Sequence, residues 1–596
     1  MPFGAELTVD GNACFRVWAP RYQRIGLRLD AGRVLPMRAL ADGWHEQLLP
    51  DLPAGSRYQF LLPDGMAVPD PASRFQPQDV HGPSELIDPT RHVWRDQAWR
   101  GRPWNEAVLY ELHIGTFTPA GTFSAAIERL DHLVRLGVTA LELMPVADFP
   151  GRRNWGYDGV LLFAPDSSYG RPEDLKALVD AAHAAGLMVL LDVVYNHFGP
   201  EGNYLSLYAP QFFNPRHQTP WGAAVNFDTE GAATVREFFV HNALYWLEEY
   251  HFDGLRFDAT HAIVDESPQH ILEELADRIR AAPLPRAVHL VLENEHNESR
   301  WLERDGAGRA RLYDAQWNDD VHHVLHVSAS GETEGYYEEY GDTEKIGRAL
   351  AQGFAFQGQH MRYRGSARGE PSAHLPPSAF IAFLQNHDQI GNRAFGERLS
   401  VIAPAPALRA VTALYLLLPQ IPMLFMGEEW QSARPFLFFC DFGPELANAV
   451  SDGRRQEFER FAAFQDDSKR ARIPDPQAER TFLESKLDWE RLADGAHART
   501  LRWYQDLLAV RRRHLVPLLP RLHRSGEYHV INARALVVRW RGDDHHELTL
   551  ELNLNPESRS GFPDSPGYLL WQEGHTGRTG TLGPWCLRCL LTASSE

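Results

Sequence analysis

Four polar clusters, each at the end of a short apolar segment, contain the residue types that glycoside hydrolysis requires. They are Asp192–His197, Arg256–His261, Glu293–Glu295 and Asn386–Asp388. Carboxyl groups can act as nucleophile, general acid and general base, and histidine can hydrogen-bond a sugar. One cluster alone is more simply a structural ion pair. The chemistry therefore depends on whether the fold brings the four clusters together.

Asp258 and Glu293 are the strongest pair of catalytic candidates. Retaining glycosidases use an ionised carboxylate as nucleophile and a carboxylic acid roughly 5–5.5 Å away as general acid/base. Arg256 lies two residues before Asp258 at a strand end, so both side chains point the same way and the arginine lowers the pKa of the aspartate. Nearby negative charge and the apolar Val291 and Leu292 would raise the pKa of Glu293. We therefore predict Asp258 as nucleophile and Glu293 as acid/base.

The remaining polar side chains are predicted to bind or orient the sugar. Asp388 would hydrogen-bond the sugar hydroxyls more strongly as the ring flattens in the transition state. Asp192 and Asn196 would support the site from behind. The loops Trp317–Asp320 and Glu428–Trp430 would supply specificity, because hydroxyl-rich ligands are best distinguished by polar groups. The predicted substrate-binding residues are Arg256, His197, His261, Asn318, Asp319, Asn386 and His387.

A divalent metal site is the main chemical alternative for these clusters. Asp192, His197, Asp258 and His387 are all ordinary metal ligands. Metal motifs usually place two ligands close together on one helix, as in H-E-x-x-H, and this sequence has no such motif. We rank the metal site below the carbohydrate site, and we predict neither a metal ion nor a cofactor.

Short apolar segments alternate with amphipathic helices from residue 108 onward, which is typical of a parallel sheet. Helical periodicity is clear in two segments, Phe123–Val134 and Ile271–Ile279. The predicted strands are Val108–His113, Thr139–Met144, Met188–Val193, Gly254–Asp258, His289–Glu293, Ala315–Trp317, Phe380–Leu384 and Met423–Met426. Eight such units predict an α/β fold, a closed (β/α)8 TIM barrel, in which the C-terminal strand ends share one mouth.

Alternating apolar and polar residues at both ends of the chain predict flanking β-sandwiches. We expect an N-terminal β-sandwich over residues 1–100, the catalytic barrel over 101–515 with a long loop insertion at about 196–234, and a C-terminal β-sandwich over 516–596. Leu548, Leu550 and Leu552 would share one face of a C-terminal strand. The run Arg511–Arg513 is interpreted as a solvated helix end.

Composition limits the partners and the compartment. The 596-residue chain has a formal net charge of −20, which argues against nucleic acid or an anionic membrane as a partner and favours a neutral ligand. The N-terminal segment has no basic leader with an apolar core, and no later run is long enough to span a membrane, so we expect a soluble cytoplasmic protein. Four cysteines are too few for disulfides to hold this fold together.

The four clusters resemble the signature regions of the α-amylase family of retaining glycosidases. D-V-V-Y-N-H, G-L-R-F-D-A-T-H, the strand-five glutamate and Q-N-H-D occur in the family's order. The resemblance implies Asp258 as nucleophile, Glu293 as acid/base and Asp388 as stabiliser, and it makes Tyr157 a stacking platform for the sugar. The usual alanine before the acid is Leu292 here, and a second acid, Glu295, follows as a less favoured proton donor.

Further stretches are similar to family members that release trehalose from maltooligosyltrehalose. They include Y-E-L-H-I-G-T-F-T-P-A-G-T-F, D-A-Q-W-N-D-D-V-H-H and M-G-E-E-W-Q-S-A-R-P-F-L-F-F. This resemblance implies cleavage of the α-1,4 bond next to a terminal α,α-trehalose unit, an immunoglobulin-like N-terminal module, and the maltooligosyltrehalose synthase as pathway companion. A glycogen branching enzyme, which transfers the glycosyl group to sugar, and a non-catalytic glucan-binding protein are the alternatives.

Overall fold

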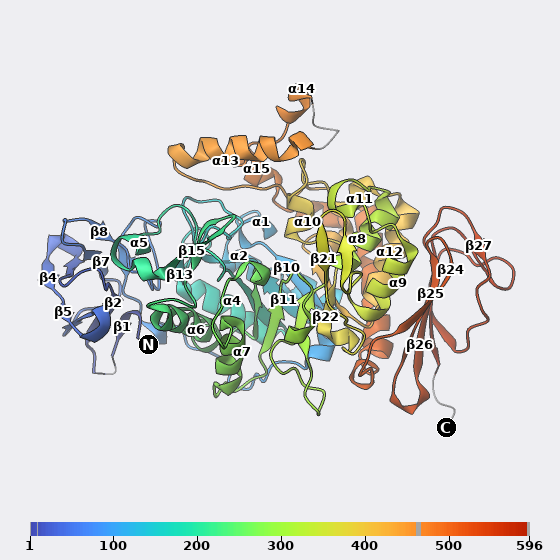
Figure 1. Ribbon diagram of the computed structural model, residues 1–596, viewed down its shortest axis with the longest axis horizontal. Helices are drawn as coiled ribbons and strands as arrows, with labels where there is room; N and C mark the ends of the chain where they lie inside the picture. Colours follow the sequence, from blue (N-terminus) through green and yellow to red (C-terminus); the bar gives the residue numbers. More distant parts are fainter. Residues whose placement is uncertain (1, 9, 461–465, 593–596) are drawn as a thin grey trace.

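The computed structural model describes the whole chain except residues 1, 9, 461–465 and 593–596. Figure 1 shows three parts in chain order along the long axis: N-terminal sheets, a central barrel with its helices, and a C-terminal sheet. In the described residues, no helix is both long and apolar enough to span a membrane. The flanking β domains and the central barrel confirm the predicted fold class.

The centre of the molecule is a closed parallel barrel of eight strands. Their order around the barrel follows the sequence, and the last strand pairs with the first. The strands are β10 (Leu109–Leu112), β11 (Ala140–Leu143), β14 (Met188–Val193), β17 (Gly254–Phe257), β18 (His289–Leu292), β19 (Ala315–Trp317), β22 (Phe380–Ala382) and β23 (Ile421–Phe425). All eight predicted strands are confirmed, with ends shifted by at most two residues. These strands are buried on both faces, as parallel strands under a layer of helices must be.

Helices cover the outside of the barrel. The main ones are α4 (Pro172–Ala184), α6 (Ala232–Glu249), α7 (Ile271–Ala281), α8 (Asp319–Ser330), α9 (Thr343–Gln352), α12 (Ala405–Leu417) and α16 (Gly495–Val510). The other α-helices are α1 (Ile114–Phe117), α2 (Phe123–Ile127), α3 (Leu130–Leu136), α5 (Leu205–Tyr208), α10 (His387–Gly391), α11 (Leu399–Ile402), α13 (Pro444–Glu457), α14 (Asp467–Arg470) and α15 (Glu479–Glu484). Small antiparallel pairs lie in the loops: β12 (Ala147–Asp148) with β13 (Leu161–Pro165), β15 (Phe213–Thr219) with β16 (Gly222–Val225), and β20 (Gln359–Met361) with β21 (Ser366–Arg368).

Helical periodicity was a good guide for one segment and a partial one for the other. The apolar face of α7 is buried as expected. The prediction of a single helix from Phe123 to Val134 is wrong, because the chain forms two helices, α2 and α3, with a break at Glu128 and Arg129 between them. The break rotates the second helix about its axis, and Val134 is 42% exposed instead of buried.

The N-terminal part contains two antiparallel sheets. One has the order β1 (Gly4–Leu7), β2 (Ala13–Trp18), β6 (Trp44–Leu49) and β5 (Arg38–Ala39). The other has the order β4 (Val34–Pro36), β3 (Gly26–Leu29), β7 (Arg57–Leu61) and β8 (Ala67–Val68), with β9 (Ser84–Glu85) also on β7. Phe3 contacts Phe238 of α6 with the ring centroids 5.3 Å apart, so this part packs directly on the barrel.

The C-terminal part is a five-stranded antiparallel sheet with a small two-stranded sheet beside it. The large sheet has the order β24 (Glu527–Asn532), β25 (Ala535–Arg541), β26 (Glu547–Asn553), β30 (Cys586–Thr592) and β28 (Tyr568–Glu573), and the small one pairs β27 (Arg559–Ser560) with β29 (Thr581–Leu582). The leucine face of β26 joins the main core, and its other face is buried too, so Glu551 is fully covered and pairs with Arg588 at 2.7 Å. All four cysteines are buried free thiols.

The prediction that Arg511–Arg513 is solvated is wrong for Arg511 and confirmed for Arg512 and Arg513, which are exposed. Arg511 follows α16 and has no exposed surface. Its guanidinium donates to the carbonyl oxygens of Leu416, Leu418 and Gln420, at the end of α12 and in the turn before β23. Burial lowers the pKa of Arg511 to about 9. A buried arginine on backbone carbonyls satisfies helix-end acceptors, which a run of three arginines in sequence does not reveal.

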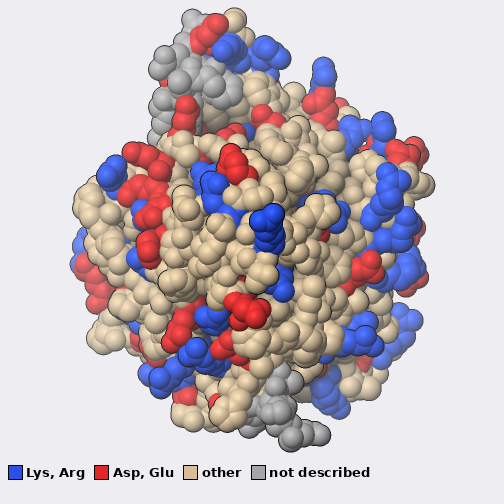
Figure 2. Space-filling view, turned by 90° about the vertical axis from the view of Figure 1, so that its right-hand side faces the viewer, with Lys and Arg blue, Asp and Glu red and all other residues tan. Residues whose placement is uncertain are grey.

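Charge is mixed on the surface at the end of the molecule where the C-terminal sheet lies. Figure 2 shows acidic and basic side chains interspersed there on a mostly uncharged surface. A face of mixed sign gives no long-range attraction for a polyanion.

Candidate active site

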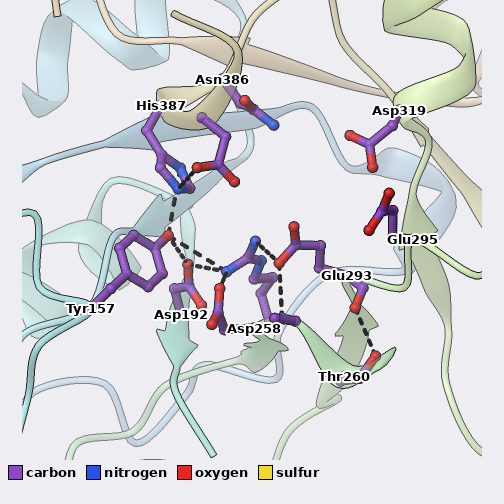
Figure 3. A network of polar contacts seen from close by, with 12 residues as sticks. Tyr157, Asp192, Asp258, Thr260, Glu293, Glu295, Asp319, Asn386 and His387 are labelled. Carbon is purple, nitrogen blue, oxygen red and sulfur yellow. Dashed lines mark hydrogen bonds and ion pairs between the residues drawn. The ribbon is translucent and has the colours of Figure 1, made fainter. Parts of the chain in front are cut away.

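Arg256 is the centre of the site at the C-terminal ends of the barrel strands. Its guanidinium is fully buried, and Nη1 donates to Asp192 Oδ2 at 2.6 Å and to Asp258 Oδ1 at 2.9 Å (Figure 3). Nη2 donates to Glu293 Oε2 at 2.7 Å. The carbon of the guanidinium lies 4.0 Å from the centre of the Trp317 ring, which fixes its plane. One arginine therefore holds three carboxylates that come from three neighbouring strands.

Strand register explains why Asp258 and Glu293 meet. Phe257 of β17 is opposite Leu292 of β18, so the next residues, Asp258 and Glu293, leave the sheet side by side. Backbone contacts then tie the two strand ends together. Ala259, in the left-handed region at φ 39°, donates its N–H to Glu293 Oε2 at 2.8 Å, and Thr260 donates its N–H and hydroxyl to the Glu293 carbonyl at 2.9 and 2.7 Å.

The ionisation order of the two carboxyl groups differs from the prediction. Burial opposes charge on both groups, but Arg256, His261 and the Ala259 N–H outweigh it at Glu293 and lower the pKa of that group. Burial, with the charges of Glu293 and Asp192, outweighs Arg256 at Asp258 and raises the pKa of Asp258. The expectation that Arg256 favours Asp258 alone is therefore wrong for the free site, because the same guanidinium also binds Glu293.

Asp192 and Asn196 lie behind Asp258. Asn196 donates its amide to Asp258 Oδ2 at 2.8 Å and to the Asp258 carbonyl at 3.0 Å. Asp192 accepts from Arg256 and from the Tyr157 hydroxyl, which is 2.6 Å away. Tyr157 stacks on His387 with the ring centroids 4.9 Å apart, so the tyrosine ring forms one side of the site.

Asp388 enters from β22 at the first turn of α10. Its side chain is 36% exposed, with Oδ1 3.5 Å from Nε2 of His387. Burial raises the pKa of Asp388 in spite of the positive His387 and Arg256. The charge of Glu293 also raises the pKa of Asp388, so the two carboxyl groups are close to each other. Asp388 therefore reaches the site from the end of β22, which β19 separates from β18 in the barrel.

A second set of polar side chains lies beyond Glu293, made up of Glu295, His261, Arg364 and Asp319. Glu295 is 49% exposed and pairs with Arg364 at 3.1 Å and with His261 at 3.5 Å, so it does not reach Arg256. Asp319, at the start of α8, points toward Glu295 and Glu293 in Figure 3 and accepts from Gln389 at 3.4 Å. Burial raises the pKa of Asp319 well above its usual range. His261 and Asp319 are thus close to Glu293.

Several predicted residues serve the framework instead of facing this space. Asn318 is 1% exposed and donates its amide to the Gly353 carbonyl at 2.9 Å and to Gln420 at 3.0 Å. Asn386 is also 1% exposed, and its side chain caps α10 by accepting from Gln389 N–H at 2.8 Å. Both ring nitrogens of His197 contact protein oxygens, those of Asn196 and of the Tyr157 carbonyl.

The Glu428–Trp430 loop also lies away from the site. Glu428 accepts from Tyr415 at 2.6 Å, and Glu429 accepts from Tyr110 and His132. Trp430 is fully buried. The prediction that this loop supplies contacts at the mouth is therefore wrong, because all three side chains are buried and the two glutamates bind Tyr415, Tyr110 and His132.

The metal alternative requires a cation between the same carboxylates that bind Arg256. Asp192 and Asp258 both accept from its Nη1, so a guanidinium already lies where the ion would have to be. Elsewhere in the described residues, one group, His217, Asp228 and Glu266, has side chains close enough to share an ion. Asp228 of that group already accepts from Asn214 at 2.8 Å and from Arg216 at 3.3 Å.

Sequence analysis missed Glu111 on β10. This carboxylate is 1% exposed and accepts from both His387 Nδ1, at 2.5 Å, and His387 N–H, at 3.2 Å. It also missed Trp221, whose ring stacks on His197 at 5.0 Å and is 48% exposed. An acidic residue inside a strand as apolar as Leu109–Leu112 was the available signal, since side chains alternate along a strand and every second one faces the barrel interior.

Comparison with known proteins identifies the family. Residues 76–212 match the alpha amylase catalytic domain, and residues 523–587 match a domain of unknown function, DUF3459. The chain is 46% identical over 501 residues to the malto-oligosyltrehalose trehalohydrolase of Deinococcus radiodurans, covering 84% of this chain and 80% of that protein. The chain belongs to the malto-oligosyltrehalose trehalohydrolase family. The protein of that name from Saccharolobus solfataricus is 40% identical, covering 86% of this chain and 87% of that one.

Further similarity is found to a branching enzyme and to solved structures. The 1,4-alpha-glucan branching enzyme of Vibrio cholerae is 38% identical over 262 residues, which cover 40% of this chain and 36% of that protein. The crystal structure of a putative alpha amylase from Salmonella typhimurium matches with a TM-score of 0.94 and 46% identity over 99% of both chains. A pullulanase from Anoxybacillus sp. LM18-11, at 16% identity and a TM-score of 0.71, shows that the fold is shared more widely. The chain is therefore a glycosidase of the α-amylase family, as predicted.

Proposed function

We propose that this protein hydrolyses the α-1,4-glucosidic bond next to the terminal α,α-trehalose unit of maltooligosyltrehalose, releasing trehalose and a maltooligosaccharide. The observation that carries the proposal is the fork of Arg256, whose two terminal nitrogens bind Asp258 and Glu293 on adjacent strands. Carboxyl groups held on one guanidinium are close enough for the roughly 5–5.5 Å separation of a retaining mechanism. The name of the close relatives supports the substrate.

In this proposal, Asp258 attacks the anomeric carbon and Glu293 gives its proton to the departing glycosidic oxygen. The bond between sugar and trehalose breaks as the bond to Asp258 forms. Glu293 then takes a proton from water, which attacks the same carbon and releases Asp258, so the configuration is retained. Asp388 accepts hydrogen bonds from the sugar hydroxyls, and these strengthen as positive charge develops on the ring.

Glu293 must carry a proton when the bond breaks. In the free site Arg256 and the Ala259 N–H favour its ionised form. A bound sugar displaces water from the space between Glu293, Asp388 and Tyr157, and removal of water favours the neutral acid. Protonation of Glu293 removes one of the negative charges that raise the pKa of Asp258, and Arg256, which still donates to Asp258, then favours the ionised nucleophile.

We assign recognition of the trehalose unit to the second set of polar side chains, which lies beyond Glu293. Trehalose is the leaving group, so its hydroxyls must lie on the side of the proton donor. Asp319, Glu295 and His261 are on that side, and Arg364 pairs with Glu295 there. Polar groups that would be left unpaired by a plain maltooligosaccharide supply discrimination. Tyr157, His197, His387 and Asn386 line or support the opposite side, where the glucan chain would bind.

The proposal extends to cellular context. We place the enzyme in the cytoplasm, in trehalose biosynthesis, where a maltooligosyltrehalose synthase would provide its substrate. Residues 1–100 would form a carbohydrate-binding-like module, 101–515 the catalytic unit and 516–596 the C-terminal unit. Expression of the full chain with a fluorescent tag, followed by fractionation of the host cells, tests the location.

The substrate is tested by incubating the protein with maltooligosyltrehalose and measuring free trehalose. We expect trehalose and the shortened maltooligosaccharide in equal amounts, with the anomeric configuration retained in the initial product. A parallel incubation with amylose tests for new branch points. Branched glucan without trehalose would replace the proposal by a branching enzyme, and binding without any product would replace it by a glucan-binding protein.

A further inference from the structure

Glu111 and His387 form a buried pair beneath the site. Glu111 binds the same histidine twice, through the ring Nδ1 at 2.5 Å and through the backbone N–H at 3.2 Å. Each side chain is 1% exposed, so the ion pair is shielded from water. Glu111 lies on β10 and His387 in the turn after β22, and only β23 lies between these two strands in the barrel. The pair therefore fastens the loop that carries Asp388 to a nearby strand of the barrel wall.

The ring of His387 has little freedom. It stacks on Tyr157, contacts the edge of Trp155 at 5.5 Å and lies 6.0 Å from Trp317. Glu111 accepts the Nδ1 proton, so Nε2 is the nitrogen that faces Asp388 Oδ1, 3.5 Å away. A ring with a carboxylate at each nitrogen carries a proton on both, which makes it an imidazolium.

We propose that Glu111 is a positioning residue that keeps His387 charged, with its Nε2–H directed at Asp388 and at the sugar bound there. Removal of the negative charge of Glu111 leaves His387 buried with one carboxylate instead of two. Burial disfavours the charged ring, but Asp388 and Glu111 outweigh it and raise the pKa of His387 to about 9. The inference rests on the proposed function, because it takes Asp388 as a group that contacts the reacting sugar.

The other ionisable groups around His387 also enter the charge balance. Those that act on its ring, or are acted on by it, are Glu142 of β11, His113, Tyr157, Asp192, Arg256 and Glu293. Arg256 opposes the charge on His387, whereas the carboxylates favour it. Among the described carboxylates, Glu111 and Asp388 face the two ring nitrogens, and the Tyr157 hydroxyl lies 3.5 Å from Nδ1. The charge of Glu111 is thus the contribution that a single substitution removes without touching the reacting groups.

Glu142 provides a matched control. It is opposite Glu111 in the strand pair β10–β11 and is 1% exposed as well. Neither of its carboxyl oxygens has a hydrogen-bond partner among the described residues. Burial, together with the charge of Glu111, raises the pKa of Glu142 well above its usual range. Glu142 is therefore a neutral acid, and an amide of the same shape changes little.

The test compares the pH profiles of kcat/KM for wild type, Glu111→Gln and Glu142→Gln between pH 5 and pH 9. Glu111→Gln should keep activity near that of wild type at pH 5 and lose about tenfold per pH unit above the lowered pKa of His387. Glu142→Gln should follow wild type throughout. Glu111→Asp keeps the charge and should keep the shape of the wild-type pH profile at a lower rate. It replaces Glu111→Gln as the informative variant if Glu111→Gln does not fold.

Two results overturn the inference: a Glu111→Gln profile that matches wild type, and one reduced equally at every pH, which a purely structural role would produce. A Glu111→Asp profile with a new loss of activity at neutral pH also overturns it. The profile is measured on whichever α-glucan the wild-type enzyme cleaves. Wild type that cleaves glucan without releasing trehalose would refute the substrate, while the shape of the Glu111 profiles would still decide the inference.

Discussion

Glu293 and Glu295 are two acids close enough in sequence to compete as proton donor, and the structure separates them. Glu293 is 16% exposed and bonded to Arg256 and to the Ala259 N–H. Glu295 is 49% exposed, and its partners are Arg364 and His261 at the rim. Glu293→Gln and Glu295→Gln keep the shapes of the side chains and remove their acidity. We predict a large loss of activity for the first variant and a small one for the second.

The expected magnitudes follow from the environments. A positioned general acid contributes about 10²–10⁴-fold to the rate, and Glu293→Gln should lower kcat for maltooligosyltrehalose by that factor. An exposed ion pair is worth about 0.2–1 kcal/mol, so Glu295→Gln should cost at most about fivefold in kcat/KM. The assay is initial-rate release of trehalose, with circular dichroism and thermal unfolding to show that both variants fold.

Chemical rescue makes the comparison sharper. A glycosyl fluoride needs no general acid, because fluoride leaves unprotonated, so it should still form the bond to Asp258 in a Glu293→Ala variant. Azide, which needs no general base, should then displace Asp258, restore turnover and give a glycosyl azide of retained configuration. A Glu295→Gln variant that loses 10²-fold or more, together with an active Glu293→Gln variant, would refute the assignment. Rescue of Glu295→Ala by azide, without rescue of Glu293→Ala, would refute it as well.

Three further predictions follow from the same contacts. Asp258→Ala should abolish trehalose release and still bind the substrate in calorimetry, and unchanged turnover would exclude this residue as nucleophile. Arg256→Lys loses the fork that joins Asp258 to Glu293, a charge-assisted bond worth about 1.5–3 kcal/mol, so kcat/KM should fall about 10- to 100-fold. Its control, Arg588→Lys, changes the pair with Glu551 in the C-terminal sheet and should lower only the unfolding temperature. Equal effects of the two variants on activity would contradict the role of the fork. Burial holds the pKa of His323 well below its usual range, and its Nδ1 has no partner among the described residues, so the folded state resists a proton that the unfolded chain accepts below about pH 6.5. The unfolding temperature of wild type should therefore fall from pH 7 to pH 5, and that of His323→Phe should fall less. The prediction fails if both fall equally.

The barrel could be predicted because its strands are short, mostly apolar segments with polar residues at or near their C-terminal ends. Met188–Val193 has Asp192 as its next-to-last residue, and Asp258 directly follows Gly254–Phe257. Helix boundaries were less visible. The break between α2 and α3 and the burial of Arg511 both depend on neighbours distant in sequence, namely the packing that rotates α3 and the carbonyls near β23. Local periodicity contains no information on such contacts.

Residues of the site that lie directly at strand ends were found in the sequence, and the residues that support them were not. Asp258, Glu293 and Asp388 follow their strands by one to six residues and converge because barrel strands are parallel. Asn318 follows a strand too, yet its amide turns toward Gly353 and Gln420. Spacing predicts which end of the barrel a side chain occupies, but whether it faces the mouth or the wall is decided by packing.

The charge balance of the site explains why a single arginine, shared among carboxylates, suits this chemistry. Glu111, Asp192, Asp258, Glu293 and Asp388 are gathered around the two cations Arg256 and His387. With Glu293 protonated, four carboxyl groups and two cations remain in this buried space. A positive charge developing on the sugar ring favours the ionised forms of Asp258 and Asp388, whose pKa values burial raises in the free site. A neutral sugar in the ground state gains little from these charges. The same arrangement that makes ionisation of the free site costly therefore favours the transition state over the bound substrate.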